Sequence, residues 1–237
     1  MAEFLLIHGS GHGAWCWRDV LPLLNNGDHR ARAIDLPGHG SDKTPIDDLT
    51  LEHYTDAILA AIDTPVILVG HSLAGVSISA AAQNRPELVS RLVYLTAWAP
   101  KDGQSALDIR RASNSEALLR AMVRSPDRLS TSFAPEMLNA LFYHDCPPGT
   151  LEYAMVNLCP EPIAPAKSPV HLGANYASVP RSYIRCMDDR AIAPDYQVEM
   201  SQNWPKRNLY NMQCAHSPFF AQPGKLAQIL LQIAEDI

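Results

Sequence analysis

Ser72 is surrounded by the residue types that a serine nucleophile needs. The segment GHSLAG at 70–75 follows an apolar run at 66–69 and leads into a stretch of small residues. The order strand, serine, helix is typical of a nucleophile elbow, a sharp turn that needs small residues two positions away on either side. Gly70 meets this need, and Ala74 replaces the second glycine of G-x-S-x-G. The alternative is an ordinary serine that caps a helix N-terminus.

A glycine-rich loop, HGSGHG at 8–13, directly follows the first apolar run. Glycines let backbone N–H groups come close to an oxyanion that develops during acyl transfer. We predict that the N–H groups of Ser10 and Leu73 form this oxyanion hole. A phosphate-binding loop is disfavoured, because G-x-G-x-x-G and the P-loop lysine are both absent. A metal pair of His8 and His12 lacks the glutamate of H-E-x-x-H, and we predict no metal.

His216 is the predicted general base. It lies in the segment CAHSP at 214–218, between the last predicted strand and the last predicted helix. In this class of site the chain order is serine, acid, histidine, so the base comes last. The alternative is a surface loop histidine. The remaining loop and cap histidines are predicted to be solvated: His29, His39, His144 and His171.

The acid that orients the imidazole has two adjacent candidates. Asp188 and Asp189 both follow the strand-like segment 182–187. Neighbouring side chains point in different directions, so only one of them can reach the base. The residues themselves leave this choice open, with Asp102 as a further candidate after an earlier strand. Asp35 is predicted instead to cap its own glycine-rich loop.

Short apolar runs alternate with amphipathic stretches, which predicts an α/β fold with a parallel sheet between two layers of helices. The predicted strands lie at 4–7, 32–34, 66–69, 92–95, 182–187 and 208–212. The predicted helices around them lie at 15–24, 51–62, 73–83, 194–204 and 223–237.

The alternation breaks after Pro100. Residues 101–179 contain helical segments, predicted at 115–124 and 135–143, and proline-rich loops. We therefore expect residues 1–100 and 180–237 to form one core domain, with residues 101–179 inserted as a cap.

The composition narrows the class of protein. A chain of 237 residues that is 47% hydrophobic can bury a large core. A net charge of −6 without a dense Lys/Arg cluster disfavours nucleic-acid and anionic-membrane partners. The N-terminal segment does not read as a signal peptide, and no apolar run approaches the roughly 20 residues that span a bilayer. Five scattered cysteines without CxxC predict free thiols, so we expect a cytoplasmic protein.

Four segments, at 4–17, 35–40, 183–197 and 215–220, together resemble the plant hydroxynitrile lyase and methylesterase branch of the α/β-hydrolases, with its bacterial esterase relatives. The resemblance covers nearly the whole chain and is least exact in the cap. It implies a mostly parallel six-stranded sheet with a small helical cap over the active site. The family's acid loop aligns without gaps, and its catalytic aspartate falls on Asp189.

Two positions depart from the lyases in this branch. The lyases carry a threonine after the first-strand histidine and a lysine after the catalytic histidine, where this chain has Gly9 and Ser217. The resemblance implies that this lysine stabilises leaving cyanide in the lyases. Serine has no such charge, so the departure favours an esterase. The resemblance also implies a substrate pocket, although each of these residues can equally be core or cap packing: His12, Leu73, Trp98, Phe133 and Phe142.

The sequence therefore predicts a cofactor-free serine hydrolase for a small-to-medium hydrophobic or aromatic carboxylic ester. Ser72 would form an acyl-enzyme, with His216 as base and Asp189 as its orienting acid. Three rivals remain: a lyase on the same fold, a cofactor-free dioxygenase that uses the histidine–aspartate pair, and a non-catalytic ligand-binding protein. The expected partner is a small molecule, and a homodimer is left open.

Overall fold

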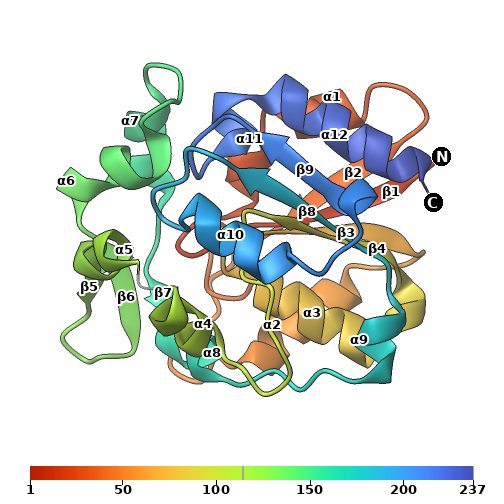
Figure 1. Ribbon diagram of the computed structural model, residues 1–237. Helices are drawn as coiled ribbons and strands as arrows, with labels where there is room; N and C mark the ends of the chain where they lie inside the picture. Colours follow the sequence, from red (N-terminus) through yellow and green to blue (C-terminus); the bar gives the residue numbers. More distant parts are fainter. Residues whose placement is uncertain (114, 237) are drawn as a thin grey trace.

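One parallel sheet forms the centre of the molecule in the computed structural model, which describes residues 1–113 and 115–236 (Figure 1). Its strand order is β2-β1-β3-β4-β8-β9, and every neighbouring pair is parallel. The strands are β1 (Glu3–Ile7), β2 (Arg30–Ile34), β3 (Val66–His71), β4 (Val89–Leu95), β8 (Arg181–Cys186) and β9 (Leu209–Met212). The predicted six-stranded parallel sheet is confirmed.

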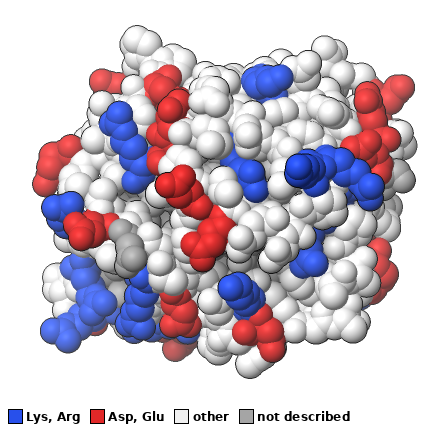
Figure 2. All heavy atoms as spheres, in the orientation of Figure 1, with Lys and Arg blue, Asp and Glu red and all other residues white. Residues whose placement is uncertain are grey.

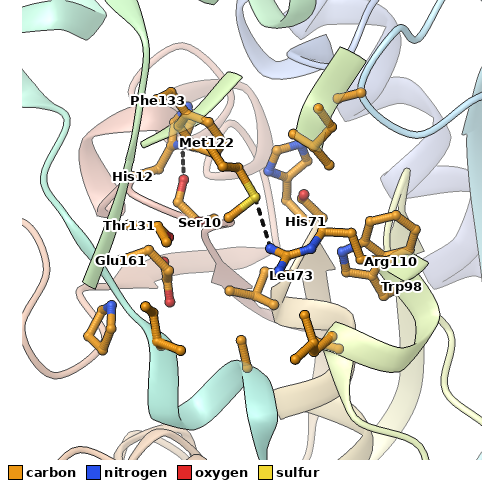
Figure 3. A pocket seen from close by; sticks show the side chains of 18 of the residues that line it. Ser10, His12, His71, Leu73, Trp98, Arg110, Met122, Thr131, Phe133 and Glu161 are labelled. Carbon is orange, nitrogen blue, oxygen red and sulfur yellow. Dashed lines mark hydrogen bonds between the residues drawn. The ribbon is translucent and has the colours of Figure 1, made fainter. Parts of the chain in front are cut away.

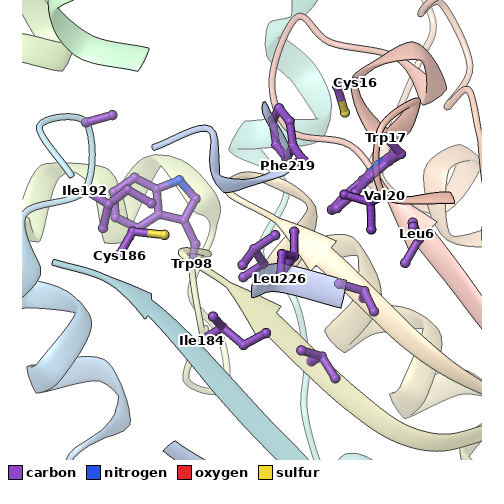
Figure 4. Packing of buried hydrophobic residues seen from close by; sticks show 14 of the residues in the cluster. Leu6, Cys16, Trp17, Val20, Trp98, Ile184, Cys186, Ile192, Phe219 and Leu226 are labelled. Carbon is purple, nitrogen blue, oxygen red and sulfur yellow. The ribbon is translucent and has the colours of Figure 1, made fainter. Parts of the chain in front are cut away.

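Helices cover both faces of this sheet (Figure 1). On one side lie α1 (Leu21–Leu24), α11 (Pro218–Ala221) and α12 (Pro223–Glu235); on the other lie α2 (Leu51–Ala60), α3 (Ala74–Asn84) and α9 (Ala174–Ser178). Successive strand residues point to opposite faces, so Leu6 packs in one apolar cluster and Leu5 in the other. Figure 4 shows the first cluster, where Leu6 packs near Trp17 and Val20. Both faces of the sheet are therefore buried, which explains the continuous apolar runs in its strands.

Two predicted helices are interrupted in the structure. The segment 15–24 consists of a 3-10 turn at Ala14–Trp17 followed by the short α1. The segment 115–124 forms α5 (Glu116–Ala121) and then β5 (Met122–Arg124), which pairs antiparallel with β6 (Ser130–Phe133). The prediction missed the turn residues Ser125-Pro126-Asp127, which reverse the chain and favour a hairpin over a continued helix.

The chain between β4 and β8 carries the remaining small elements. It contains α4 (Ala106–Ala112), α5, α6 (Pro135–Leu138) with a π-helical turn at Asn139–Tyr143, α7 (Thr150–Asn157), α8 (Ile163–Lys167) and α9, plus a small antiparallel sheet β5-β6-β7, where β7 is Glu161–Pro162. In Figure 1, α5, α6 and α7 extend to the left of the central sheet. By contrast, α9 packs against α3, and Tyr176 joins a core cluster. The division of the chain into a core and a cap at 101 and 179 stays a prediction.

Two further features concern the whole described chain. Its five cysteines are free thiols. Among the helices of residues 1–113 and 115–236, none is both long enough and apolar enough to cross a bilayer.

Gly75 lets α3 begin in direct contact with the loop after β4. A Cβ atom on Gly75 would stand only 2.2 Å from the backbone oxygen of Trp98. In the same contact, the Trp98 N–H donates to the Ser72 carbonyl at 3.0 Å. The absence of a side chain at Gly75 therefore brings Trp98 beside the turn that carries Ser72.

The substitution Gly75→Ala is expected to lower the free energy of unfolding by about 1–3 kcal/mol, the range for an overpacked site. The atom that the new methyl group meets belongs to the backbone, so no side chain can rotate away. Urea denaturation measures the change. The matched control is Gly224→Ala at the start of α12, where nothing lies within 4 Å of an added Cβ, and stability should be equal or higher. Equal stability of the two variants would contradict the tight contact.

Candidate active site

Ser72, His216 and Asp189 meet at the carboxyl edge of the sheet. Ser72 follows β3, Asp189 follows β8, and His216 lies between β9 and α11. The Ser72 Oγ lies 3.0 Å from His216 Nε2, and His216 Nδ1 lies 2.7 Å from Asp189 Oδ2. The carboxyl ends of parallel strands share one edge, which is why residues so far apart in the sequence come together.

The backbone at Ser72 has the strained conformation of an elbow. Its φ is 54°, in the left-handed region that residues other than glycine rarely adopt. The Ser72 N–H donates to the Leu95 carbonyl at 3.3 Å, and its carbonyl accepts from the N–H groups of Gly75 and Trp98 at 3.2 and 3.0 Å. These bonds hold the turn and direct Oγ towards His216.

Of the three candidate acids, only Asp189 is within hydrogen-bond reach of His216. Asp189 is buried, whereas Asp188, one residue earlier, is exposed. Asp102 is also exposed and accepts from the Leu172 N–H at 2.8 Å. The alternation of buried and exposed positions after β8 thus separates the two adjacent aspartates.

Four donors besides His216 surround the Asp189 carboxylate. Oδ1 accepts from the N–H groups of Ala191 and Ile192 at 2.7 and 2.9 Å. Oδ2 accepts from the Thr96 hydroxyl and from Gln197 Nε2, the latter at 3.3 Å. These bonds fix the orientation of the carboxylate towards the imidazole.

Sequence reasoning missed Thr96 and Gln197. Thr96 directly follows β4 and has a φ of 38°, an outlier for a β-branched residue. Its N–H donates to the Ile184 carbonyl at 2.8 Å, which holds it in place. Gln197, on α10 (Pro194–Ser201), is fully buried, and its Oε1 accepts from the Cys186 N–H at 2.9 Å. Neither role has a local signal in the sequence, because both depend on contacts between separate strands and loops.

The predicted oxyanion donors are available. Within the part of the chain that the structure describes, the N–H groups of Ser10 and Leu73 donate to no other protein group. Both residues line the same pocket as Ser72. A Cβ atom on Gly9 would lie 2.8 Å from His71 Nδ1 and 2.9 Å from Ser72 Cβ, so only glycine allows the loop to come this close. Two backbone dipoles are thus free beside the nucleophile.

His12 lines the pocket but uses both ring nitrogens to hold the oxyanion loop. Its Nδ1 lies 2.8 Å from the Ser10 carbonyl, which can only accept, so Nδ1 carries the proton. Its Nε2 then accepts from the Tyr143 hydroxyl at 2.8 Å. Burial lowers the pKa of His12 to about 4, so the ring is neutral at neutral pH.

His8 is similarly engaged. Its Nδ1 donates to the Gly9 carbonyl at 2.9 Å, and its Nε2 accepts from the Leu36 N–H at 3.0 Å. A metal pair of His8 and His12 would have to break these bonds. Over residues 1–113 and 115–236, no three His, Cys, Asp or Glu side chains are grouped as a metal site requires.

The prediction that His39 is a solvated loop residue is wrong. Its side chain is buried, and Nε2 lies 3.0 Å from Glu161 Oε2. The same carboxylate accepts from the Gly11 N–H at 2.9 Å, in the middle of the oxyanion loop. Burial opposes the charge on both partners, yet the charge and hydrogen bond of Glu161 raise the pKa of His39, and those of His39 lower the pKa of Glu161. The buried ion pair of His39 and Glu161 therefore stabilises the oxyanion loop through the Gly11 N–H.

One pocket brings the predicted substrate-binding residues together. Trp98, Phe133, Phe142 and Leu73 line it with Ser72. The Phe142 ring centroid lies 5.4 Å from that of His216 and 4.8 Å from that of Phe133. Figure 3 shows Trp98 and Phe133 among the lining side chains. The walls nearest the catalytic histidine are therefore largely apolar.

A parallel sheet whose third strand ends in a strained serine, followed by an acid and a histidine after two later strands, is the architecture of the α/β hydrolases. The chain belongs to this family: residues 4–229 match the model described as the alpha/beta hydrolase family.

Within the family, the chain is similar to plant methylesterases. Methylesterase 1 of Arabidopsis thaliana is 32% identical over 98% of this chain and 96% of its own. Two longer chloroplastic relatives from the same plant are covered over 72% and 56% of their lengths. Among solved structures, the pyrethroid hydrolase PytH is 27% identical with a TM-score of 0.87, over 99% of this chain and 98% of its own. Polyneuridine aldehyde esterase is 25% identical with a TM-score of 0.87, over 99% of both chains.

The substitution Glu161→Gln is expected to lower the free energy of unfolding by about 1–3 kcal/mol in the pH range where both partners are charged. The pKa of His39 is raised above 6.5, so its contribution is present below pH 6.5 and is lost as the pH rises through the folded value. The pKa of Glu161 is lowered below 4.5, so its contribution is present above pH 4.5 and is lost as the pH falls through the folded value. The deficit should therefore be largest between pH 4.5 and 6.5.

Urea denaturation at a series of pH values measures this deficit. Glu152→Gln, an exposed change on α7, is the control and should show no such maximum. A deficit that keeps rising above pH 6.5 would contradict the ion pair between His39 and Glu161.

Proposed function

We propose that the protein is a carboxylic-ester hydrolase that acts through an acyl-enzyme on Ser72. The observation that carries the proposal is the continuous hydrogen-bonded chain from Ser72 Oγ through His216 to Asp189, with two free backbone N–H groups beside it. Relatives named methylesterase and esterase support an ester as the substrate.

The geometry supports the following sequence of steps. His216 Nε2 takes the proton of Ser72 Oγ as it attacks the ester carbonyl, while Asp189 stabilises the resulting imidazolium through Nδ1–H. The N–H groups of Ser10 and Leu73 bind the oxyanion of the tetrahedral intermediate. His216 then gives its proton to the leaving alcohol. Water, activated by the same histidine, attacks the acyl-enzyme and releases the acid.

Two features favour hydrolysis over cyanohydrin cleavage. Ser217, directly after the histidine, is fully buried and carries no charge that would stabilise a leaving cyanide. At Gly9, any larger residue would require Ser72 or His71 to move, because a Cβ there lies within 3 Å of both. Neither lyase-type residue is therefore present or readily accommodated.

The pocket supports a small-to-medium hydrophobic or aromatic ester. Trp98 and Phe142 provide flat apolar walls, the Phe142 ring lies beside His216, and Phe133 packs edge-on against Phe142. Aromatic walls of this kind bury apolar surface and prefer edge or offset contacts with rings. The name methylesterase, carried by the plant relatives, suggests a methyl ester as the first substrate to test.

The substitution Ser72→Ala is expected to lower ester turnover by about a thousandfold or more, because it removes the nucleophile and leaves only the oxyanion hole and binding. Release of p-nitrophenol from short-chain p-nitrophenyl esters measures turnover before and during steady state. A burst in the native protein, absent from the variant, is the expected sign of an acyl-enzyme. Ser132→Ala on the exposed side of β6 is the control and should turn over like the native protein.

Equal and feeble rates in the native protein and Ser72→Ala would overturn the proposal. In that case oxygen consumption and cyanohydrin cleavage distinguish the two remaining catalytic uses of His216 and Asp189. Tight ligand binding without turnover would indicate a non-catalytic binding protein.

A further inference from the structure

The pocket that holds Ser72 has a charge bias that its aromatic walls do not explain. Three cationic side chains line it, from Arg110 on α4, Arg124 on β5 and Lys167 at the end of α8. The one carboxylate in the lining, Glu161, is already bound to His39 and to the Gly11 N–H. Among the described residues of the lining, the three cations therefore have no negative partner.

Arg110 is half-buried, whereas Arg124 and Lys167 are exposed. Figure 3 shows its guanidinium between Leu73 and Trp98, with a dashed line to Met122. Its Nη1 donates to the Met122 sulfur at 2.9 Å, and its Nε is buried with no hydrogen-bond partner in the described chain. A thioether is a weak acceptor, so the five N–H donors of this group are poorly satisfied.

Among the residues that the structure describes, no carboxylate pairs with Arg110. In the described part of the chain, no ion pair involves Arg110, Arg124 or Lys167. Burial, followed by the charges of Arg111 and Arg124, lowers the pKa of the Arg110 guanidinium. A charged group held in such a place without a partner costs stability, unless a ligand supplies the missing acceptor.

The bias belongs to the pocket and not to the whole surface. The chain carries a net charge of −6, and Figure 2 shows acidic and basic side chains interspersed over the visible face. Inside the pocket, burial keeps His12 and His71 neutral by lowering the pKa of each, to about 4 for His12. These two histidines therefore add nothing to the positive charge of the pocket.

We propose that Arg110 binds a carboxylate on the substrate, so that the ester is a half-ester of a dicarboxylic acid with an apolar or aromatic body. The proposal rests on the proposed function and names its substrate class. The planar guanidinium matches a carboxylate with two parallel hydrogen bonds, and the apolar walls hold the chain between that carboxylate and the ester at Ser72. Arg124 and Lys167, both exposed, attract the anion to the pocket mouth.

Matched pairs of methyl esters test this directly in the native protein. One member is the monomethyl ester of a dicarboxylic acid, in a series from succinic to sebacic acid and including terephthalic acid. The other has the free carboxyl replaced by a primary amide. A hydrogen bond to a charged group predicts that kcat/KM for the best acid exceeds that for its amide by about 10- to 100-fold. Equal values across the series would overturn the proposal.

Substitution of Arg110 assigns the preference to its residue. In Arg110→Met the ratio of kcat/KM between acid and amide should fall to near one, and Arg110→Lys should keep part of it, because lysine retains the charge but not the planar fork. The control is Arg111→Met, the next residue on the same helix, which is exposed and does not line the pocket. A preference that survives in Arg110→Met would overturn the role of Arg110.

Binding to Ser72→Ala separates this proposal from the proposed function. Calorimetry with the same acid and amide pair should give a dissociation constant about 10- to 100-fold lower for the acid, and Arg110→Met in the same background should abolish the difference. If no ester is turned over but this difference is present, the hydrolase proposal fails and the carboxylate site stands. If esters are hydrolysed through Ser72 without a difference in binding or turnover, the carboxylate site fails and the hydrolase proposal stands.

Discussion

The backbone contact between the Ser72 turn and the loop after β4 determines most of the site. Ser72 keeps its positive φ because its N–H donates to the Leu95 carbonyl and its own carbonyl accepts from the Trp98 N–H. The same loop begins at Thr96, itself strained, whose hydroxyl bonds to the Asp189 carboxylate. This backbone contact between the Ser72 turn and the loop after β4 therefore positions both the nucleophile and the acid. Gly75 allows the contact because it leaves room for the Trp98 carbonyl. The strain at two neighbouring positions is tolerated because bonds across strands over-determine both.

The oxyanion loop depends on the residues between β4 and β8 as much as on the sheet. Tyr143 bonds to His12, which bonds to the Ser10 carbonyl, and Glu161 bonds to the Gly11 N–H. These contacts fix the direction of the Ser10 N–H before any substrate arrives. Preorganised dipoles need little rearrangement as charge develops, which is what makes backbone N–H groups effective there. The segment between β4 and β8 lines the pocket and also supports the oxyanion loop.

The sequence predicted those parts of the site that follow from local pattern. Ser72, His216 and the loop at Ser10 each follow a predicted strand, and parallel strands bring such loops to one edge. Residues that act only through distant contacts gave no such signal. His39 and Glu161 are 122 residues apart, and nothing near either one indicates a partner. The strain at Thr96 follows from the packing of β4 against β8, which a threonine after an apolar run does not reveal.

The predicted helix at 115–124 was wrong for a different reason from the missed site residues. Its first half has helical composition, and the pattern extends naturally to Arg124. The helix ends because Met122 pairs with Phe133 in the β5–β6 hairpin, and this pairing depends on the hairpin as a whole. Tertiary pairing overrode a weak local preference, as it commonly does in short segments. The consequence reaches the pocket, because Met122 and Phe133 both line it.

The pocket separates two kinds of negative charge. The oxyanion exists only during the reaction, and the N–H groups of Ser10 and Leu73 meet it with dipoles that carry no net charge. A cation at that position would also bind the carboxylate product and slow its departure. Binding every state equally would not accelerate the reaction. Arg110 instead lies on α4, on a different element from either donor. A permanent charge on the substrate can therefore be held for orientation, while the charge formed at the reacting carbon is stabilised only for as long as it exists.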